Sequence, residues 1–288
     1  MVTWDIGGKA CLVTGATGGI GRATARALAR GGARLVLTDL DQVALDVLAA
    51  DLRGTGARVL AARAVDLTDA AAVRSFADEV HDEFGPLDVV LNIAGISIWG
   101  TVDRFTEDHW RRLIDVNLMG PVHVLSAFLP PMIEAGWGGH VVNVSSAAGL
   151  FGLPWHAAYS ASKFGLRGVS EVLRFDLRRH GIGVSLVCPG AVATPLVREL
   201  EVVGVDRSAP SIQRVEQRFL RHAVTPDEAA AAIVRGIVRR RYWVYTSRDV
   251  RLGHYAQRWF PWGYAWAMRW LNRELTRAEA QSTRGARR

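Results

Sequence analysis

Ala10-Cys11-Leu12-Val13-Thr14-Gly15-Ala16-Thr17-Gly18-Gly19-Ile20-Gly21 is the stretch of sequence that decides the fold. Its first five residues form an apolar run that predicts a buried strand, and a helical pattern follows from Arg22 to Arg30. A strand, a glycine turn and a helix in succession present backbone N–H groups and a helix N-terminus to a pyrophosphate. Gly15 permits the tight turn, Gly19 the approach of a phosphate and Gly21 a close helix–strand contact. A simple turn is the alternative, because the spacing differs from Gly-x-Gly-x-x-Gly.

Apolar runs of strand length recur along the chain with helical patterns between them. They cover residues 10–14, 34–38, 59–65, 87–93, 140–144 and 182–188, and a seventh short run covers 243–245. This alternation predicts an α/β fold with a single Rossmann-type, doubly wound parallel sheet of about seven strands. The 288 residues suffice for one such domain, which we place at residues 1–245, with a C-terminal helical extension at 246–288.

Acidic residues follow the second and third of these runs. Asp39 lies eighteen residues after Gly21, where a carboxylate can accept hydrogen bonds from an adenosine ribose and repels a 2′-phosphate. It therefore favours NAD, whereas Arg22 and Arg34 keep NADP as the alternative. Asp66 is placed either to meet the adenine edge or to cap the helix expected after Thr68.

Tyr159 and Lys163 are four residues apart, which is one helical turn, so their side chains are expected on one helix face. Lys163 is one of two lysines in a chain rich in arginine. An ammonium beside a tyrosine stabilises the phenolate and is expected to lower the tyrosine pKa, which suits a general acid or base. An exposed Tyr/Lys pair is the alternative for this motif taken alone.

Together these motifs resemble the short-chain dehydrogenase/reductase family. The resemblance extends from about Gly8 to Thr194 and rests on the glycine turn, Asn92-Ile93-Ala94-Gly95, Asn117, Ser146, Tyr159, Lys163 and Pro189-Gly190. The family motif Asn-Asn-Ala-Gly has Ile93 at its second position here, so we expect the turn to be kept with altered local hydrogen bonding.

The resemblance implies a catalytic set of Asn117, Ser146, Tyr159 and Lys163. Ser146, and not Ser145, would hold the substrate oxygen, and Tyr159 would exchange a proton with it. Lys163 would lower the Tyr159 pKa and bind the nicotinamide ribose, and Asn117 would hold a water that links Lys163 to solvent.

The same resemblance implies the ligand contacts. Cofactor-binding residues would be Gly15, Thr17, Gly19, Ile20, Gly21, Asp39, Asp66, Leu67, Asn92, Ala94, Gly95, Tyr159, Lys163, Pro189, Gly190, Val192 and Thr194. Residues 195–225 would cover the substrate, with contacts from Ser146, Trp155, His156 and Leu196. Apolar side chains in these segments predict a lipophilic alcohol or ketone, such as a steroid-like, retinoid-like or fatty compound.

Two classes of function follow. The first is an NAD(P)-dependent oxidoreductase that interconverts a primary or secondary alcohol and its carbonyl compound. The second is a nucleotide-sensing regulatory or scaffold protein without turnover. The set of Ser146, Tyr159 and Lys163 favours the enzyme, because nucleotide binding alone does not need all three. Members of the family commonly assemble as homotetramers or homodimers, and either state is expected here.

Composition points to a cytoplasmic protein. The two cysteines, Cys11 and Cys188, lie in expected strands and suit small core residues in a reducing compartment. The sequence shows no signal-peptide pattern and no run of eighteen apolar residues, so no membrane-spanning helix is expected. None of the eight histidines has metal-ligand spacing, and no metal is expected.

The C-terminal region is basic and aromatic. Residues 236–288 hold twelve arginines against three acidic residues, which gives a net charge of +9, while residues 1–235 sum to −2. We expect a helix from Pro261 to about Thr276 with Tyr264, Met268, Leu271 and Leu275 on one face and Trp262, Trp266 and Trp270 on the other. The outer face fits a peripheral membrane contact, a subunit interface or a tail packed on its own domain. No nucleic-acid-binding motif accompanies the charge, so we do not expect that partner.

Overall fold

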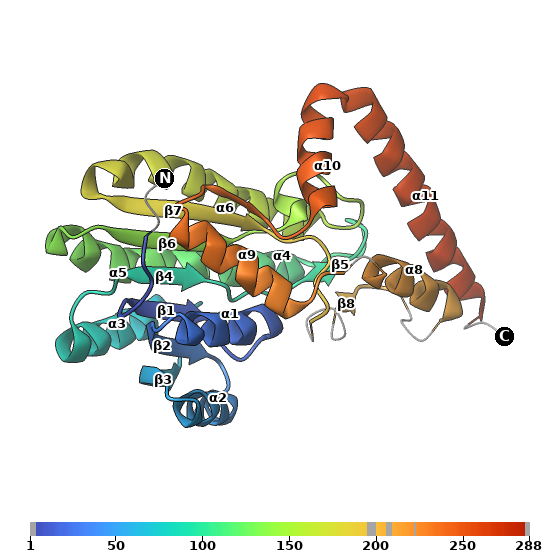
Figure 1. The fold of residues 1–288 in the computed structure, drawn as a ribbon. Coiled ribbons are helices and arrows are strands. Elements are labelled where there is room, and N and C mark those ends of the chain that lie inside the picture. The colour runs from blue at the N-terminus through green and yellow to red at the C-terminus, as the bar shows by residue number, and fades with distance from the viewer. Residues whose placement is uncertain (1–3, 195–199, 206–208, 222, 286–288) are drawn as a thin grey trace.

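Seven parallel strands form the central sheet of the protein (Figure 1). The computed structural model describes residues 4–194, 200–205, 209–221 and 223–285. The strand order is β3-β2-β1-β4-β6-β7-β9, which confirms the predicted doubly wound sheet. The strands are β1 (Ala10–Thr14), β2 (Arg34–Asp39), β3 (Arg58–Ala64), β4 (Val89–Asn92), β6 (Gly139–Val144), β7 (Ile182–Cys188) and β9 (Trp243–Tyr245).

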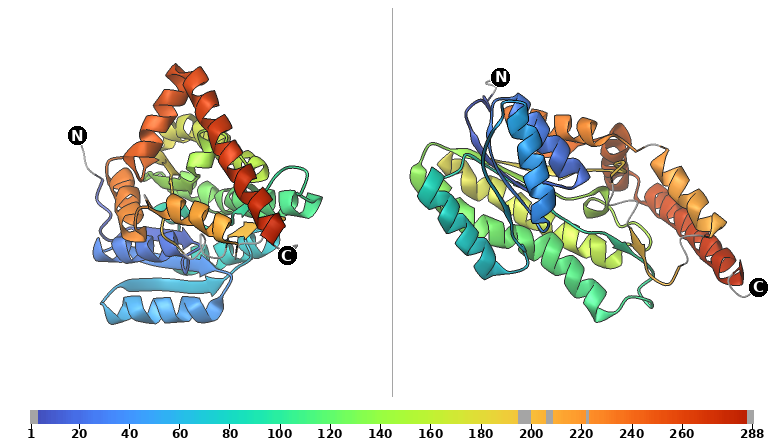
Figure 2. Two further views of the ribbon diagram at one scale, coloured as in Figure 1. Left: turned by 90° about the vertical axis from the view of Figure 1, so that its right-hand side faces the viewer. Right: turned by 90° about the horizontal axis from the view of Figure 1, so that it is seen from below.

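Helices cover both faces of this sheet (Figures 1 and 2). One face carries α1 (Gly19–Arg30), α2 (Gln42–Gly54) and α9 (Pro226–Val238), and the other carries α3 (Ala70–Phe84), α5 (Gly120–Ala135) and α6 (Ala157–Asp176). Each face has its own apolar core, the first around Leu28, Leu45 and Ile233 and the second around Phe76, Phe128 and Met132. Burying a side chain of this size contributes about 1.5–3 kcal/mol. The central strands β1, β4 and β6 are therefore buried on both faces, as parallel strands between two helical layers must be.

Both cysteines are free and buried in strands, as the sequence predicts. Burial raises the pKa of the Cys188 thiol to about 12, so this thiol stays protonated near neutral pH. Burial likewise raises the pKa of the Cys11 thiol. Both side chains therefore act as small apolar core residues.

The glycine turn brings α1 very close to β1. Gly15 has a φ of +62°, and a Cβ there would lie 2.7 Å from the Ala94 Cα atom. A Cβ on Gly21 would overlap the Gly15 carbonyl group. The helix begins at Gly19, three residues before the predicted start, because this packing holds the glycines in helical geometry despite their low intrinsic preference for it.

A second feature differs from the sequence analysis. The helical stretch Glu107–Ala135 comprises α4 (Glu107–Ile114), a π-helical turn (Asp115–Met119) and α5, and it is long and apolar enough to span a membrane by length and composition. Its apolar side chains include Val124, Phe128 and Met132, which are buried in the core beside the sheet. Part of its apolar surface is therefore used in packing against the sheet.

Elements beyond the main sheet lie around its carboxyl edge. Two short strands, β5 (Ile98–Trp99) and β8 (Glu201–Val202), pair in parallel. Helix α8 (Pro210–Leu220) follows, and α10 (Arg248–Trp259) and α11 (Pro261–Gly285) form a hairpin that projects from the body (Figures 1 and 2). The sequence predicts neither β5, β8 nor α10, and α11 extends beyond the predicted end at about Thr276.

Replacing Gly21 tests the close contact of α1 with the turn. We expect Gly21→Ala to lower the free energy of unfolding by about 2 kcal/mol, because the added methyl group overlaps the Gly15 carbonyl. Gly54→Ala is the matched control, since a Cβ at that helical position meets nothing within 4 Å. Urea unfolding followed by circular dichroism measures both changes. Equal stability of the two variants would contradict the proposed contact.

Candidate active site

Two adjoining cavities open at the carboxyl edge of the sheet. Their volumes are about 410 and 300 Å³, and together they form a single cleft. Both are lined by Ile20, Ile93, Gly95, Ile96 and Thr194. The cleft lies above β1 and β4, where the strand order reverses, which is where doubly wound sheets bind ligands.

The smaller cavity is shaped by the glycine turn. Of the predicted cofactor contacts, those that line it are Gly15, Gly19, Ile20, Gly21, Asp39, Asp66, Leu67, Ala94, Gly95 and Thr194. The Asp39 carboxylate accepts hydrogen bonds from the Thr17 hydroxyl at 2.6 Å and the Thr17 N–H at 2.9 Å. It also accepts one from the Leu40 N–H at 2.8 Å. Thr17 therefore anchors Asp39 at the cavity and does not itself line the wall.

Asp66 lies on the cavity wall and does not cap a helix. Its carboxylate accepts hydrogen bonds from the Thr68 N–H and hydroxyl at 2.9 and 2.8 Å. The side chain that caps α3 is Asp69, which accepts from the N–H groups of Ala71 and Ala72. The helix-cap alternative for Asp66 is therefore wrong, because the helix starts one turn later than that alternative requires.

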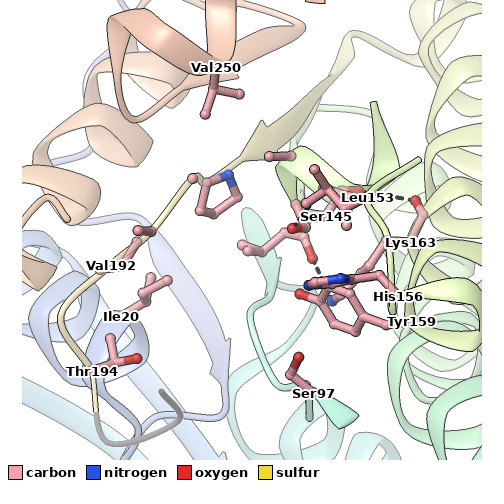
Figure 3. A pocket seen from close by; sticks show the side chains of 18 of the residues that line it. Ile20, Ser97, Ser145, Leu153, His156, Tyr159, Lys163, Val192, Thr194 and Val250 are labelled. Atoms are coloured by element: carbon pink, nitrogen blue, oxygen red, sulfur yellow. Dashed lines mark hydrogen bonds between the residues drawn. The ribbon is translucent and has the colours of Figure 1, made fainter. Parts of the chain in front are cut away.

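Ser146, Tyr159 and Lys163 all line the larger cavity, and Figure 3 shows the last two of them there. Ser146 follows β6, and the other two side chains lie one turn apart on α6. The Lys163 ammonium donates to the Val144 carbonyl at 3.1 Å and lies 5.9 Å from the centre of the Tyr159 ring. Ser145 also lines this cavity, but its hydroxyl is engaged by the protein, since it donates to the Lys163 carbonyl at 3.0 Å.

Burial dominates the electrostatics of this group. It raises the pKa of Tyr159, and a hydrogen bond with the Ser146 side chain lowers it by less. Burial also lowers the pKa of Lys163 to about 8. The prediction that the neighbouring ammonium depresses the Tyr159 pKa is therefore wrong for this structure, because removing the phenolate from water has the larger effect.

Asn117 occupies the π-helical turn between α4 and α5. Its side-chain oxygen accepts from the Ile96 N–H at 2.9 Å, and its amide donates to the Ile96 carbonyl at 2.9 Å and to the Ser162 hydroxyl at 3.2 Å. A Cβ on Gly95 would lie 2.8 Å from this oxygen and 3.2 Å from the Lys163 ammonium nitrogen. The glycine therefore lets the β4 loop approach Asn117 and Lys163 closely.

His156 also lines the larger cavity, beside Tyr159. Its Nδ1 lies 2.7 Å from the Pro154 carbonyl, and because a carbonyl only accepts, Nδ1 carries the proton. Burial lowers the His156 pKa to about 4, so the ring is neutral and Nε2 is an acceptor. The ring centre lies 4.3 Å from that of Trp99 and 6.1 Å from that of Tyr159.

Other predicted contacts are placed differently. Trp155 is buried with a left-handed φ of +67° and is not among the residues that line the cavity, so its substrate contact stays a prediction. The Asn92 amide lies within the sheet and donates to Asn143 at 2.9 Å. Leu196 lies outside the described residues. Pro189, Gly190 and Val192 line the larger cavity.

Sequence reasoning missed several residues on the walls. Ser97 comes from the loop before β5, and Asp249 and Val250 come from the first turn of α10. Leu200, in the segment expected to cover the substrate, also lines the larger cavity. For the two residues of α10 the sequence contained one usable signal. Asp249 follows Ser247 as an acidic residue in the first turn of a helical pattern, which is typical of a helix start. No group of three or more potential metal ligands occurs among the described residues.

A sequence profile of the short chain dehydrogenase family matches residues 9–202. This chain belongs to the short-chain dehydrogenase/reductase family. Among curated family members, D-threitol dehydrogenase of Mycolicibacterium smegmatis is 40% identical over 190 residues, covering 66% of this chain and 72% of that protein.

Solved structures of the family agree with this assignment. A short-chain dehydrogenase/reductase from Burkholderia phymatum in complex with NAD is 31% identical, with a TM-score of 0.78 over 88% of this chain and 95% of that one. A metagenomic short-chain oxidoreductase in complex with NADP is 33% identical, with a TM-score of 0.66 over 85% and 94% of the two chains. The family thus includes members with either nucleotide.

Proposed function

We propose that this family member is an NAD(P)-dependent oxidoreductase that interconverts an alcohol and its carbonyl compound. The observation that carries the proposal is the meeting of Ser146, Tyr159 and Lys163 in a cavity continuous with the glycine-turn cavity. The same geometry would place a substrate beside a nucleotide bound at the turn. A regulatory or scaffold protein without turnover is less well supported, since nucleotide binding alone requires no Ser–Tyr pair in the second cavity.

The side chains divide the proton chemistry between them. A nicotinamide nucleotide bound in the cleft would supply or accept the hydride at the substrate carbon. Tyr159 gives its phenolic proton to the carbonyl oxygen in reduction and takes the hydroxyl proton in oxidation. The Ser146 hydroxyl holds that oxygen, and the Lys163 ammonium offsets the charge of the phenolate. Asn117 fixes the Ile96 backbone beside Lys163.

The smaller cavity fits a dinucleotide. Its backbone is bare where Gly15 and Gly21 lie, and α1 points its N-terminus at the turn, as phosphate binding requires. Asp39 stands at the wall with its carboxylate already fixed by Thr17. We infer that NAD is preferred over NADP, because a 2′-phosphate beside this carboxylate would be repelled.

The larger cavity favours a lipophilic substrate. Apolar side chains from four separate segments surround it, among them Trp99, Phe151, Leu153, Leu200 and Val250. A substrate oxygen would lie beside the polar side chains of Ser146, Tyr159 and His156, while Ser97, Thr194 and Asp249 line other parts of the cavity. The name of the M. smegmatis relative refers to a small polyol, so a panel of lipid and sugar alcohols decides between the two classes.

The protein is proposed to act as a homodimer or homotetramer. Helix α6 carries exposed apolar side chains at Phe164, Val172 and Phe175. A second copy packed on this helix would remove them from water. Light scattering of the purified protein measures the state.

The role of Tyr159 is tested by removing its hydroxyl group. We expect Tyr159→Phe to lower turnover by a factor of about 10²–10⁴, because the proton donor is lost. NADH affinity should stay close to that of the wild type, since the ring remains. Tyr242→Phe is the control, as that hydroxyl donates to Glu171 at 3.1 Å outside the cavity. Full activity of the Tyr159 variant would refute the proton role.

The raised pKa of Tyr159 sets the pH dependence of the two directions. A raised pKa extends the protonated phenol to higher pH, so carbonyl reduction should hold its rate at neutral pH and fall only on the alkaline side. Alcohol oxidation needs the phenolate, so its rate should rise about tenfold per pH unit below that pKa. Initial rates in both directions across pH measure the two profiles. An oxidation rate independent of pH would contradict the assignment.

Nucleotide preference is tested at Asp39. We expect Asp39→Asn to raise NADPH affinity relative to NADH by about tenfold, because the amide keeps an acceptor for Thr17 and removes the charge that repels a phosphate. Asp41→Asn is the matched control, since Asp41 caps α2 and does not line the cavity. Fluorescence titration with both nucleotides gives the ratio. An unchanged ratio for Asp39→Asn would show that other groups select the nucleotide.

A further inference from the structure

The hairpin of α10 and α11 exposes large aromatic side chains. We call Trp259 and Phe260 at its tip, together with Trp262, Trp266, Arg269, Arg273 and Arg277 of α11, the Trp–Arg face. Trp259, Trp262 and Trp266 are 70, 74 and 68% exposed. The predicted alternative of a tail packed on its own domain holds for the opposite side of α11 and does not account for these tryptophans. Such a grouping of exposed aromatic side chains marks an interaction surface.

The orientation of this face is fixed by what the other side of α11 contacts. Leu275 and Ala278 are buried, and the Ala278 carbonyl accepts from the Ser211 hydroxyl of α8 at 2.9 Å. Tyr264 donates to the Gly152 carbonyl at 2.8 Å. With one side of α11 held against the protein, the Trp–Arg face must point outward.

Tryptophan and arginine share one stripe of α11. Arg269 and Arg273 each follow a tryptophan of the stripe by seven residues, which returns to the same side of an α-helix. Both arginines are exposed. Arg277 continues the stripe and pairs with Glu274 at 2.9 Å. The stripe itself therefore carries positive charge and indole rings without an acidic residue within it.

We propose that the Trp–Arg face docks on an anionic lipid bilayer. Indole rings are stable at the headgroup level of a membrane, and guanidinium groups pair with lipid phosphates. The charge distribution is complementary to such a surface, since residues 236–288 carry +9 and the remainder of the chain −2. The projecting tip offers Trp259, Phe260 and Trp262 first, and a bilayer can accept such a tip without a preformed pocket.

The hairpin lies next to the larger cavity, so docking on a membrane would also place that cavity near the bilayer. Asp249 and Val250 at the foot of α10 line the larger cavity, and Gly152, which accepts the Tyr264 hydrogen bond, lies between wall residues Phe151 and Leu153. A protein held by its hairpin tip would thus keep the cavity near the membrane surface, where a lipophilic substrate is concentrated. This role rests on the proposed function, whereas docking itself does not.

Vesicle binding of the full chain tests the proposal. The probes are vesicles of phosphatidylcholine alone and of phosphatidylcholine with phosphatidylglycerol. Sedimentation separates the vesicle-bound protein from the free protein. We expect binding to the anionic vesicles, little binding to the neutral ones, and release at high salt. Trp262→Ala/Trp266→Ala and Arg269→Ala/Arg273→Ala should each weaken binding by about tenfold or more.

Controls separate docking from loss of folding or of assembly. Trp137→Ala removes an exposed tryptophan before β6, at the opposite edge of the sheet, and should bind like the wild type. Circular dichroism and light scattering confirm the fold and assembly of every variant. The proposal is overturned if anionic vesicles do not bind the protein or if the face variants bind like the wild type. It is also overturned if the wild-type protein binds no vesicles and the face variants break up its oligomer, because the face would then be a subunit interface. None of these readouts uses turnover, so the proposed function is tested separately.

Discussion

Close backbone approach at three glycines holds the active-site cleft together. Gly21 lets α1 meet the turn after β1, Gly15 lets that turn meet the loop after β4, and Gly95 lets the same loop meet Asn117 and Lys163. A side chain at any of these positions would push apart elements that come from distant parts of the sequence. The cleft is therefore a consequence of backbone packing first, and its chemical side chains are placed by that packing.

The buried Lys163 ammonium depends on this arrangement. A buried charge is unfavourable unless it is hydrogen-bonded, and Lys163 has the Val144 carbonyl as a partner at 3.1 Å. Burial lowers its pKa to about 8 and raises that of Tyr159. The two shifts both favour neutral side chains, so the site holds the tyrosine as a proton donor at neutral pH and leaves the lysine close to its own titration.

Much of this architecture follows from local sequence patterns. Parallel strands between two helical layers are short apolar runs, which is why all seven strands of the main sheet were predictable. The spacing of Tyr159 and Lys163 predicted that pair, and the resemblance to the family added Ser146; the structure brings all three into one cavity. The direction of the shift in the Tyr159 pKa was not predictable, since it depends on burial by segments far away in the chain.

Strands β5 and β8 are two residues long each and pair across about a hundred residues, which leaves no periodic pattern. Trp155 is absent from the cavity lining, and its backbone adopts a left-handed conformation, which is rare for an aromatic residue and which no local sequence pattern indicates.

A hydrogen bond joins α8 to a part of α11 that lies far away in the sequence. Helix α8 belongs to the segment expected to close over the substrate, and its Ser211 is hydrogen-bonded to a carbonyl sixty-seven residues later. Shortening α11, or fusing a bulky tag to it, would thus loosen the packing of α8 against it. Ser146, Tyr159 and Lys163 lie on other elements and would stay in place.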